Sequence, residues 1–302
     1  MGVMTSSNHP KDLWPGIVAH FGHTYTEHQE EFSQIFDKES SDKAYEERVQ
    51  YTGLGLASAK AQAAAIGFDE SQQGYTSRMT NVTYAIGAIV TREAIDDGQY
   101  ESIAKRLSKG MAFSLRQTKE NIGANILNRA FTSEYNGGDG VCLINSAHPE
   151  TGGNQSNVIA TAADLSEAAL EDMLIQIMQA QNARGLKISL VGQKLIVPPA
   201  LIFEATRILK SALQSGNANN DVNALKQMGL LPGGIVVNHY LTDADAWFVK
   251  TNTPEGLIYQ ERRSYEFKQD NDFDTENAKM KASERYTFGW ADFRAVYGSP
   301  GA

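Results

Sequence analysis

Residues Gln99 to Phe131 read QYESIAKRLSKGMAFSLRQTKENIGANILNRAF and contain no proline. Mostly apolar side chains recur at steps of three or four residues along this stretch, which is the spacing of one face of a helix. The members of this stripe are Ile103, Leu107, Met111, Leu115, Thr118, Ile122 and Ile126. A helix over the whole stretch would be about 50 Å long, well above the usual length in a globular protein. We therefore expect a long supporting helix.

The polar residues of the same stretch are expected on the faces that point away from the stripe. They are Lys105, Arg106, Lys109, Arg116, Lys119, Glu120 and Asn125. Alanine substitutions of Arg106, Lys109 or Arg116 should therefore alter contacts with other molecules more than folding. Gly110 and Gly123 each weaken a helix by about 1 kcal/mol relative to alanine, so curvature or close packing is expected at those two positions.

The composition narrows the class of protein. The 302 residues carry a net charge of −9, which argues against a general nucleic-acid binder because phosphate contacts need clustered Lys and Arg. The single cysteine, Cys142, excludes an internal disulfide framework and fits a reducing cytoplasm. No apolar run approaches a membrane span and no signal-peptide pattern begins the chain, so we expect a soluble protein with no membrane partner.

The chain before the long helix divides into two parts. Residues 1–45 show no strong period, and we interpret them as an extended arm with a short helix between Glu27 and Phe36. Strand-like segments follow at Arg48–Tyr51 and Met79–Val90. About 25 residues rich in glycine and alanine separate the two strands, which is too long for a tight hairpin. Such a loop is rare in a compact domain unless another chain covers it.

Mixed α/β structure is predicted after the long helix. Asp164 and Glu167 have the spacing of a capping box, so a helix should begin at Asp164, and Gly185 suits its C-terminal cap. The last two strands should form an antiparallel ribbon with one buried face, because apolar and polar residues alternate in the second. The other predicted elements are strands at Val141–Ile144, Lys194–Val197, Ile235–Leu241 and Ala246–Thr251, the last two paired, a helix from Pro199 to about Gln214, and the ribbon strands Leu257–Lys268 and Ala278–Trp290.

Patterns that would carry catalysis are incomplete. Cys142 and His148 are the only nucleophile–base pair by proximity, but Cys142 lies in an apolar run, the setting of an inert buried thiol. The segment Gly53–Gly55 begins like a dinucleotide-binding fingerprint and lacks its third glycine, so a loop is the simpler interpretation. We therefore predict no catalytic residue and no cofactor.

Metal-binding patterns are incomplete as well. His20 and His23 could share a helix face, but no further ligand completes the set. Alternating aspartates at Asp270, Asp272 and Asp274 resemble the start of a calcium loop, yet threonine and lysine stand where glycine and a bidentate glutamate are needed. We interpret the aspartates as an acidic hairpin turn and predict no metal site.

The order of these parts, an arm, a projecting loop, a long helix, an α/β lobe and a ribbon, resembles the major capsid protein of tailed bacteriophages with the Hong Kong 97-type fold. Within that family the chain resembles the major head subunit of Mu-like phages. The similarity covers nearly the whole chain from about Phe32. The segments that carry it are GGDGVCLINSAHP (Gly137–Pro149), VPPALIFEATRILKSA (Val197–Ala212), GGIVVNHYLTDADAWFV (Gly233–Val249) and RYTFGWADFRAVYGS (Arg285–Ser299).

This resemblance implies an α+β fold and a structural function. Its parts would be an N-terminal arm at 1–45, an extended loop at 46–92, a peripheral domain at 93–185 with its spine helix at 99–131, an axial domain at 186–252, and a C-terminal ribbon at 253–302 that returns to the peripheral domain. The implied function is that of a major capsid subunit, assembled in the host cytoplasm as pentamers and hexamers into an icosahedral head around double-stranded DNA.

Partners follow from the same resemblance. A scaffolding protein and a portal are implied, a decoration protein stays open, and packaged DNA should be contacted only weakly because the shell wall is negative. Some family members cross-link a lysine of the extended loop to a neighbour's asparagine. Lys60 is the only lysine between Glu46 and Glu101, but no acid-plus-asparagine pattern accompanies it, so we predict non-covalent packing. Two alternatives are an encapsulin-like bacterial compartment shell and a cytosolic hydrolase that uses Cys142 and His148.

Overall fold

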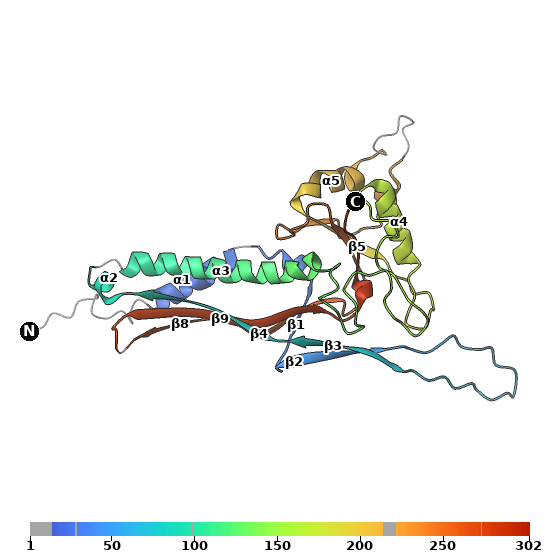
Figure 1. Ribbon diagram of the computed structural model, residues 1–302, viewed down its shortest axis with the longest axis horizontal. Coiled ribbons are helices and arrows are strands. Elements are labelled where there is room, and N and C mark those ends of the chain that lie inside the picture. The colour runs from blue at the N-terminus through green and yellow to red at the C-terminus, as the bar shows by residue number, and fades with distance from the viewer. Residues whose placement is uncertain (1–13, 28, 98–99, 214–221, 273) are drawn as a thin grey trace, which may run out of the picture.

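The structure, a computed structural model, describes residues 14–27, 29–97, 100–213, 222–272 and 274–302. A long body, a lobe that stands at one end of it and a thin loop that projects beyond that end make up the molecule (Figure 1). The C-terminus lies in the lobe. Helices and three separate sheets occur in the described part of the chain, which confirms the predicted α+β class. Among the described helices, none has both the length and the apolar character needed to cross a membrane.

The body is a four-stranded sheet with two helices along it. The strand order is β1–β8–β9–β4, with β1 Asp37–Ser40, β4 Val82–Val90, β8 Leu257–Asn271 and β9 Ala278–Trp290. β8 pairs antiparallel with β9 along nearly its whole length, and β4 pairs antiparallel with the other side of β9. The predicted ribbon is therefore confirmed, and it is longer than expected because β8 continues to Asn271.

The alternation predicted for β9 decides which of its faces is buried. Ala278, Met280, Ala282, Glu284, Tyr286 and Phe288 are all buried, whereas Lys279 and Lys281 are exposed. The buried face lies against α3 (Tyr100–Asn128), whose 29 residues span about 43 Å along the sheet. The long helix is thus confirmed, although it ends at Asn128 and the chain turns before Phe131.

The face that α3 buries is shifted from the predicted apolar stripe. Ile103, Leu107, Thr118, Ile122 and Ile126 are only partly buried. The buried positions are Ala104, Ser108, Met111, Ala112, Leu115, Arg116, Lys119, Glu120, Gly123, Ala124 and Leu127. The expectation that Arg116, Lys119 and Glu120 face outward is therefore wrong, while Arg106 and Lys109 are exposed as expected.

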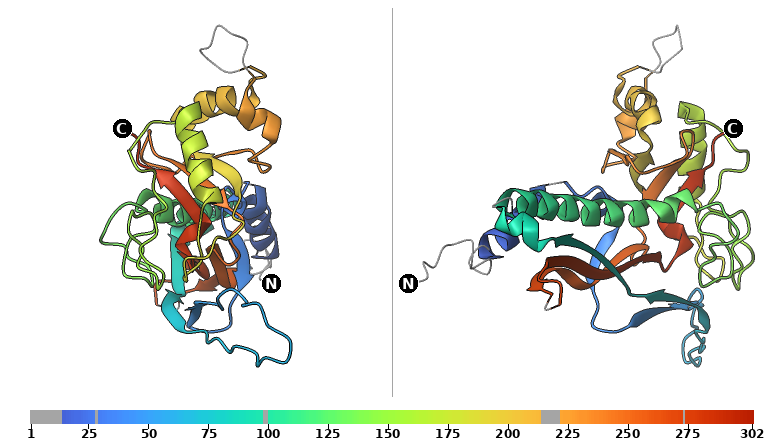
Figure 2. Two further views of the ribbon diagram at one scale, coloured as in Figure 1. Left: turned by 90° about the vertical axis from the view of Figure 1, so that its right-hand side faces the viewer. Right: turned by 60° about the vertical axis from the view of Figure 1, so that its left-hand side comes forward.

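The N-terminal segment is not an extended arm throughout. α1 (Trp14–Glu27) is a helix that lies alongside α3, as Figure 2 shows. Its Phe21 and Tyr25 rings pack against Tyr265 of β8, at 5.6 and 4.4 Å between ring centroids. Only a 3₁₀ turn, η3 (Phe32–Gln34), forms where a helix between Glu27 and Phe36 was expected.

The predicted strand at Met79–Val90 divides at Asn81. β3 (Gln73–Thr80) pairs antiparallel with β2 (Tyr45–Tyr51) in a two-stranded sheet, and β4 continues into the body. The Asn81 side chain donates hydrogen bonds to Ser41 Oγ (3.1 Å) and to the carbonyl of Lys43 (3.0 Å), which fixes the change of direction. The loop between β2 and β3 is the projecting loop of Figure 1.

The lobe contains the second four-stranded sheet. Its order is β10–β7–β5–β6, with β5 Gly192–Val197, β6 Ile235–Val237, β7 Trp247–Thr251 and β10 Val296–Ser299. β5 lies between β6 and β7, so the expected pairing of residues 235–241 with 246–251 is wrong. β10 pairs with β7, so the last strand joins the lobe and not the ribbon.

Helix boundaries in the lobe differ from the expected ones. α4 (Glu167–Met178) begins after Ser166, whose side chain accepts a hydrogen bond from the Ala169 amide, and not at Asp164. Gly185, with φ of 81°, belongs to a later turn and not to the cap of α4. α5 (Ile202–Lys210) follows a 3₁₀ turn, η4 (Pro199–Leu201), and the remaining short helices are α2 (Arg92–Asp96), α6 (Ala224–Met228) and η5 (Phe293–Ala295). No strand forms at residues 141–144, although Cys142, Leu143 and Ile144 are buried.

Candidate functional site

The thiol of the hydrolase alternative is buried and already engaged. Cys142 Sγ hydrogen-bonds to the carbonyl of Ile144 (3.3 Å) and accepts from Asn145 Nδ2 (3.4 Å). Neither of these hydrogen bonds is with His148. The structure therefore does not pair the two groups that proximity in sequence suggested.

His148 is the centre of a buried polar cluster. Its Nδ1 lies 2.5 Å from Asp139 Oδ2, its Nε2 lies 3.0 Å from Asn157 Oδ1, and its ring stacks on Phe293 at 3.8 Å between centroids. Both ring nitrogens are therefore engaged with buried side-chain oxygens and not with the Cys142 thiol.

The Asn157 amide extends the cluster to two separate parts of the chain. Its Nδ2 donates to the carbonyls of Leu143 (2.8 Å), Phe293 (3.1 Å) and Val296 (3.0 Å). Buried backbone carbonyls need partners, and here one side chain supplies them for the loop after α3 and for the C-terminal segment. The arrangement holds the lobe to the body; it does not form a catalytic centre.

Of the residues considered for metal binding, those that the structure describes are not gathered into a site. His23 is exposed on α1, and the side chain of His20 lies outside the described residues. Within the described residues no group of three or more His, Cys, Asp or Glu is placed to hold a metal ion. Asp272 accepts from Thr275 Oγ1 (3.0 Å) and pairs with Lys279 (2.5 Å), as the acidic hairpin interpretation expects.

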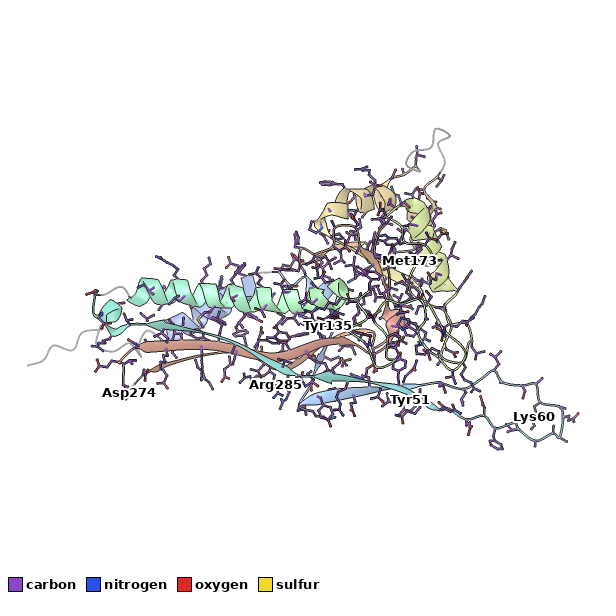
Figure 3. All side chains as sticks on the ribbon, viewed as in Figure 1. Tyr51, Lys60, Tyr135, Met173, Asp274 and Arg285 are labelled. Atoms are coloured by element: carbon purple, nitrogen blue, oxygen red, sulfur yellow. The ribbon has the colours of Figure 1, made fainter. Side chains whose placement is uncertain are left out.

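The loop between β2 and β3 carries large apolar side chains that are exposed. Phe68 is 98% exposed and Leu56 83%, and Leu54 and Ile66 are at least 60% exposed. Lys60 lies at the outer part of this loop (Figure 3). Large apolar side chains that stand in solvent on a projecting segment indicate a contact with another molecule.

The base of this loop is braced by an ion pair. Arg184 Nη1 and Nη2 lie 2.7 and 3.2 Å from the two oxygens of Asp69, and the Gly55 amide donates to Asp69 Oδ2 at 2.6 Å. These hydrogen bonds, that from Arg184 first, lower the pKa of Asp69 to about 2. The Gly53–Gly55 segment thus shapes a loop, as predicted, with Gly53 at a φ of 71°. Nothing in the sequence pointed to Arg184.

A buried ion cluster joins α1, α3 and β9. Lys119 Nζ lies 2.6 Å from Glu284 Oε2 and 2.7 Å from the Tyr25 hydroxyl, which itself donates to Glu284 Oε2 at 2.7 Å. The side chains of Lys119 and Glu284 are 5% and 0% exposed. Burial and the Glu284 carboxylate raise the pKa of Tyr25 well above its usual range. The cluster therefore fixes α1 to the body through hydrogen bonds to a buried ion pair, in addition to the aromatic contacts.

A second part of the cluster holds the turn after α1. Arg116 Nη1 lies 2.7 Å from Glu30 Oε1, and Glu120 accepts from the amides of Glu31 (3.0 Å) and Phe32 (2.9 Å). Burial opposes ionisation of Glu30, but hydrogen bonds from Lys38 and Arg116 outweigh it and lower its pKa. For Glu120 burial dominates and raises the pKa despite the two amides.

The same turn also contacts the lobe. Glu31 accepts from the amide of His239 (2.9 Å) and lies 2.7 Å from its Nδ1, and Lys194 Nζ donates to the carbonyl of Gln34 (2.7 Å). Residues 30–34 therefore lie between α3 and the lobe and contact both. No sequence signal for this junction was recognised.

Comparison with known proteins gives one family and several similar structures. A family model described as phage capsid protein matches residues 74–299. The capsid of a native GTA particle has a TM-score of 0.55 at 14% identity and covers 89% of each chain. The procapsid of bacteriophage JBD30 has a TM-score of 0.53 at 13% identity, covering 98% of this chain and 76% of that one. A structure from Mycobacterium phage Che8 has a TM-score of 0.52 at 14% identity, covering 91% of this chain and 93% of that one. No curated protein matches the chain.

Proposed function

Because the chain belongs to the phage capsid protein family, we propose that copies of it tile the icosahedral shell of a tailed-phage head around double-stranded DNA. It is a structural protein, a major capsid subunit of a phage head, with the Hong Kong 97-type fold. The net charge of −9 favours a wall that contacts packaged DNA only weakly, because like charges repel.

The observation that carries the proposal is the projecting loop at residues 52–72. A single chain leaves Phe68 98% and Leu56 83% exposed, at the far end of two strands that hold them away from the body. Burial of apolar area stabilises an association by about 25 cal/mol per Å² before its costs are counted. A neighbouring copy of the chain is the occupant that would cover this loop in a shell.

We assign the parts of the chain to the domains of a capsid subunit. We assign residues 1–45 to the N-terminal arm, 46–92 to the extended loop, and 93–185 to the peripheral domain with α3 as its spine. Residues 186–252 form the axial domain in this assignment, and 253–302 the C-terminal ribbon. The pairing of β10 with β7 supports one change, the addition of residues 296–299 to the axial domain.

The remaining partners follow from the same role. Pentamers and hexamers of the chain would form the shell in the host cytoplasm, with a scaffolding protein and a portal, and a Mu-like phage or prophage is the proposed source of the head. A decoration protein stays open. We assign the chain no catalytic activity; the engaged Cys142 thiol and the two occupied nitrogens of His148 support this.

Lys60 is assigned non-covalent packing with the neighbouring copy. It is exposed in the loop, with Asp69 held by Arg184 at the loop base and not available to it as a partner. Covalent ladders from intact particles on a denaturing, reducing gel would contradict this assignment.

Negative-stain microscopy of the purified protein, alone and with a co-expressed scaffolding protein, tests the proposed function. Rings, tubes or closed particles are expected, because many modest contacts act together in a shell. A homogeneous monomer under every condition would overturn the proposal. The variant Cys142→Ala should assemble like the wild type, whereas loss of assembly would give the thiol a role that the structure does not support.

A further inference from the structure

One side of the lobe presents an acidic and apolar surface on α4. The residues of α4 that point outward include Asp172, Ile175 and Met178, with Ile175 50% and Met178 44% exposed. Asp172 and Ile175 border, together with Ile159 and Ala163, a groove of about 550 Å³. Residues 158–183 contain no Lys or Arg, while α4 itself carries Glu167, Glu171 and Asp172. We call this the α4 surface.

The other side of the lobe presents a basic and apolar surface on α5. Phe203, Arg207 and Lys210 follow one another at helical spacing and are all exposed, with the Phe203 ring 73% exposed. Lys226 of α6 reaches the carbonyl of Lys210 at 2.9 Å and adds a third cation. Glu204 pairs with Arg207 at 3.1 Å, so the surface carries three positive charges and one negative charge. We call this the α5 surface.

The two surfaces cannot meet within one chain. Both helices cover the same face of the lobe sheet and share one apolar core. α4 contacts the edge strand β10, whereas α5 contacts the opposite edge strand β6 and its neighbour β5. The two helices therefore lie over opposite edges of the sheet, with α5 and α4 on the two sides of the lobe in Figure 1.

Resting on the proposed function, we propose that the α4 surface of one copy binds the α5 surface of the next copy around the axis of a ring. Two different and complementary patches on one molecule form a head-to-tail contact, which closes into a ring when the rotation allows. Phe203 enters the groove beside Ile175, and Arg207 faces Asp172. An aromatic anchor with an arginine beside it is the usual composition of the residues that dominate an interface.

Charge reversal tests this contact. Asp172→Arg places arginine against Arg207, and Arg207→Asp places aspartate against Asp172, so each variant alone should form rings only at a concentration about tenfold or more above that of the wild type. Both side chains are exposed, so folding should be unchanged. Asp274→Arg, the same charge change in the turn at the far end of the ribbon, is the control and should form rings like the wild type.

Mixing the two variants gives the sharpest readout. An alternating ring of Asp172→Arg and Arg207→Asp chains has an opposite charge pair at every contact, and alternation requires an even number of subunits. The equimolar mixture should therefore recover six-membered rings and not five-membered ones, as counted by native mass spectrometry and negative-stain images.

The outcomes separate this inference from the proposed function. If the wild type forms rings and either single variant does so equally well, or if the mixture stays monomeric, the α4–α5 contact is overturned and the capsid role stands. If the wild type itself forms no ring at any concentration, both are overturned. Phe203→Ser should weaken ring formation without reversing any charge, and an unaffected Phe203→Ser variant also counts against the contact.

Discussion

At the scale of single residues, the charges buried under α1 decide how the body is held together. Glu284 is fully buried, and its Oε2 pairs with Lys119 and accepts a hydrogen bond from the Tyr25 hydroxyl. Its Oε1 has no hydrogen-bond partner in the described part of the chain. A buried ion pair contributes little over an apolar replacement, but loss of one partner leaves an uncompensated charge. The cluster is thus far more sensitive to single than to paired substitutions.

Lys119→Met should lower the free energy of unfolding by about 3–5 kcal/mol, because it leaves the Glu284 carboxylate buried without a cation. The double variant Lys119→Met/Glu284→Leu should recover much of that loss, since neither charge is then buried alone. Lys109→Met changes an exposed lysine of the same helix and should cost less than about 0.5 kcal/mol. Urea unfolding of the unassembled chains measures all three, and equal losses for Lys119 and Lys109 would show that the cluster is unimportant.

The two glycines of α3 should respond in opposite directions to alanine. A Cβ at Gly110 would meet nothing within 4 Å, so Gly110→Ala should raise the free energy of unfolding by up to about 1 kcal/mol through helix propensity. A Cβ at Gly123 would lie 3.1 Å from Cε1 of the Phe288 ring, so Gly123→Ala should lower it by about 1–3 kcal/mol through overpacking. The same unfolding experiment decides, and a stabilising Gly123→Ala would mean that the ring moves freely.

At the scale of elements, periodicity predicted the long helix and the ribbon and failed where burial depends on distant partners. The stripe predicted for α3 takes account only of apolar residues. It could not show that Arg116, Lys119 and Glu120 are buried, because these side chains are satisfied by Glu30, Glu284 and two backbone amides. α1 was missed because it is stabilised by aromatic contacts with β8 and not by a pattern of its own. β5 lies between β6 and β7 in the sheet, and the chain crosses over through α5 and α6 between β5 and β6. The sequence suggested instead that β6 and β7, which are neighbours in the chain, pair with each other.

The sequence predicted only part of the candidate site. The exposed loop followed from its length and composition, because neither suits a compact domain. Its brace did not, since Arg184 reaches Asp69 across 115 positions of sequence and no local pattern links them. Cys142 was correctly expected to be buried, whereas the partners of His148 come from Asp139 and Asn157, nine residues away on either side.

The brace at the loop base should limit how freely the loop moves. Arg184→Ala removes both guanidinium contacts with Asp69, so chymotrypsin should cut at Phe68 or Leu56 several-fold faster than in the wild type, because local opening exposes the backbone. Lys187→Ala, an exposed lysine three positions later, is the control and should leave the rate unchanged. An unchanged rate in Arg184→Ala would show that the loop is held by other contacts.

The brace should also resist acid. The pKa of Asp69 in the folded chain is about 2, below its ordinary value of 3.8, because Arg184 and the Gly55 amide stabilise the carboxylate. A lowered pKa means that the contribution of the ion pair is complete above pH 3.8 and is lost as the pH falls through about 2. Hydrogen exchange of the Gly55 amide should therefore stay protected at pH 4, relative to the Arg184→Ala chain, and protection lost already at pH 5 would contradict this pKa.

At the scale of the whole molecule, the body, the lobe and the loop meet other copies in different ways. The body is closed around buried charges and rings, so it can keep its shape while the other parts bind. The lobe offers two helical surfaces suited to a ring, and the loop offers exposed apolar side chains suited to a neighbour beyond it. Separate surfaces for separate contacts allow a shell to correct errors, because each contact is weak alone and strong together.

Removal of the loop should separate these two kinds of contact. The Thr52 amide donates to the Gln72 carbonyl at 3.0 Å, and the Gln72 amide to Thr52 Oγ1 at 2.9 Å, so the ends of the loop already lie side by side. A chain without residues 54–70 would join Gly53 to Ser71 as a two-residue turn with glycine in the left-handed region that such turns use. It should fold normally and form rings through α4 and α5, yet yield no closed particles in negative-stain images. Lys60→Ala in the full-length chain is the control and should still form closed particles, because the packing of Lys60 is non-covalent. Closed particles from the loop-deleted chain would show that the shell contact lies elsewhere.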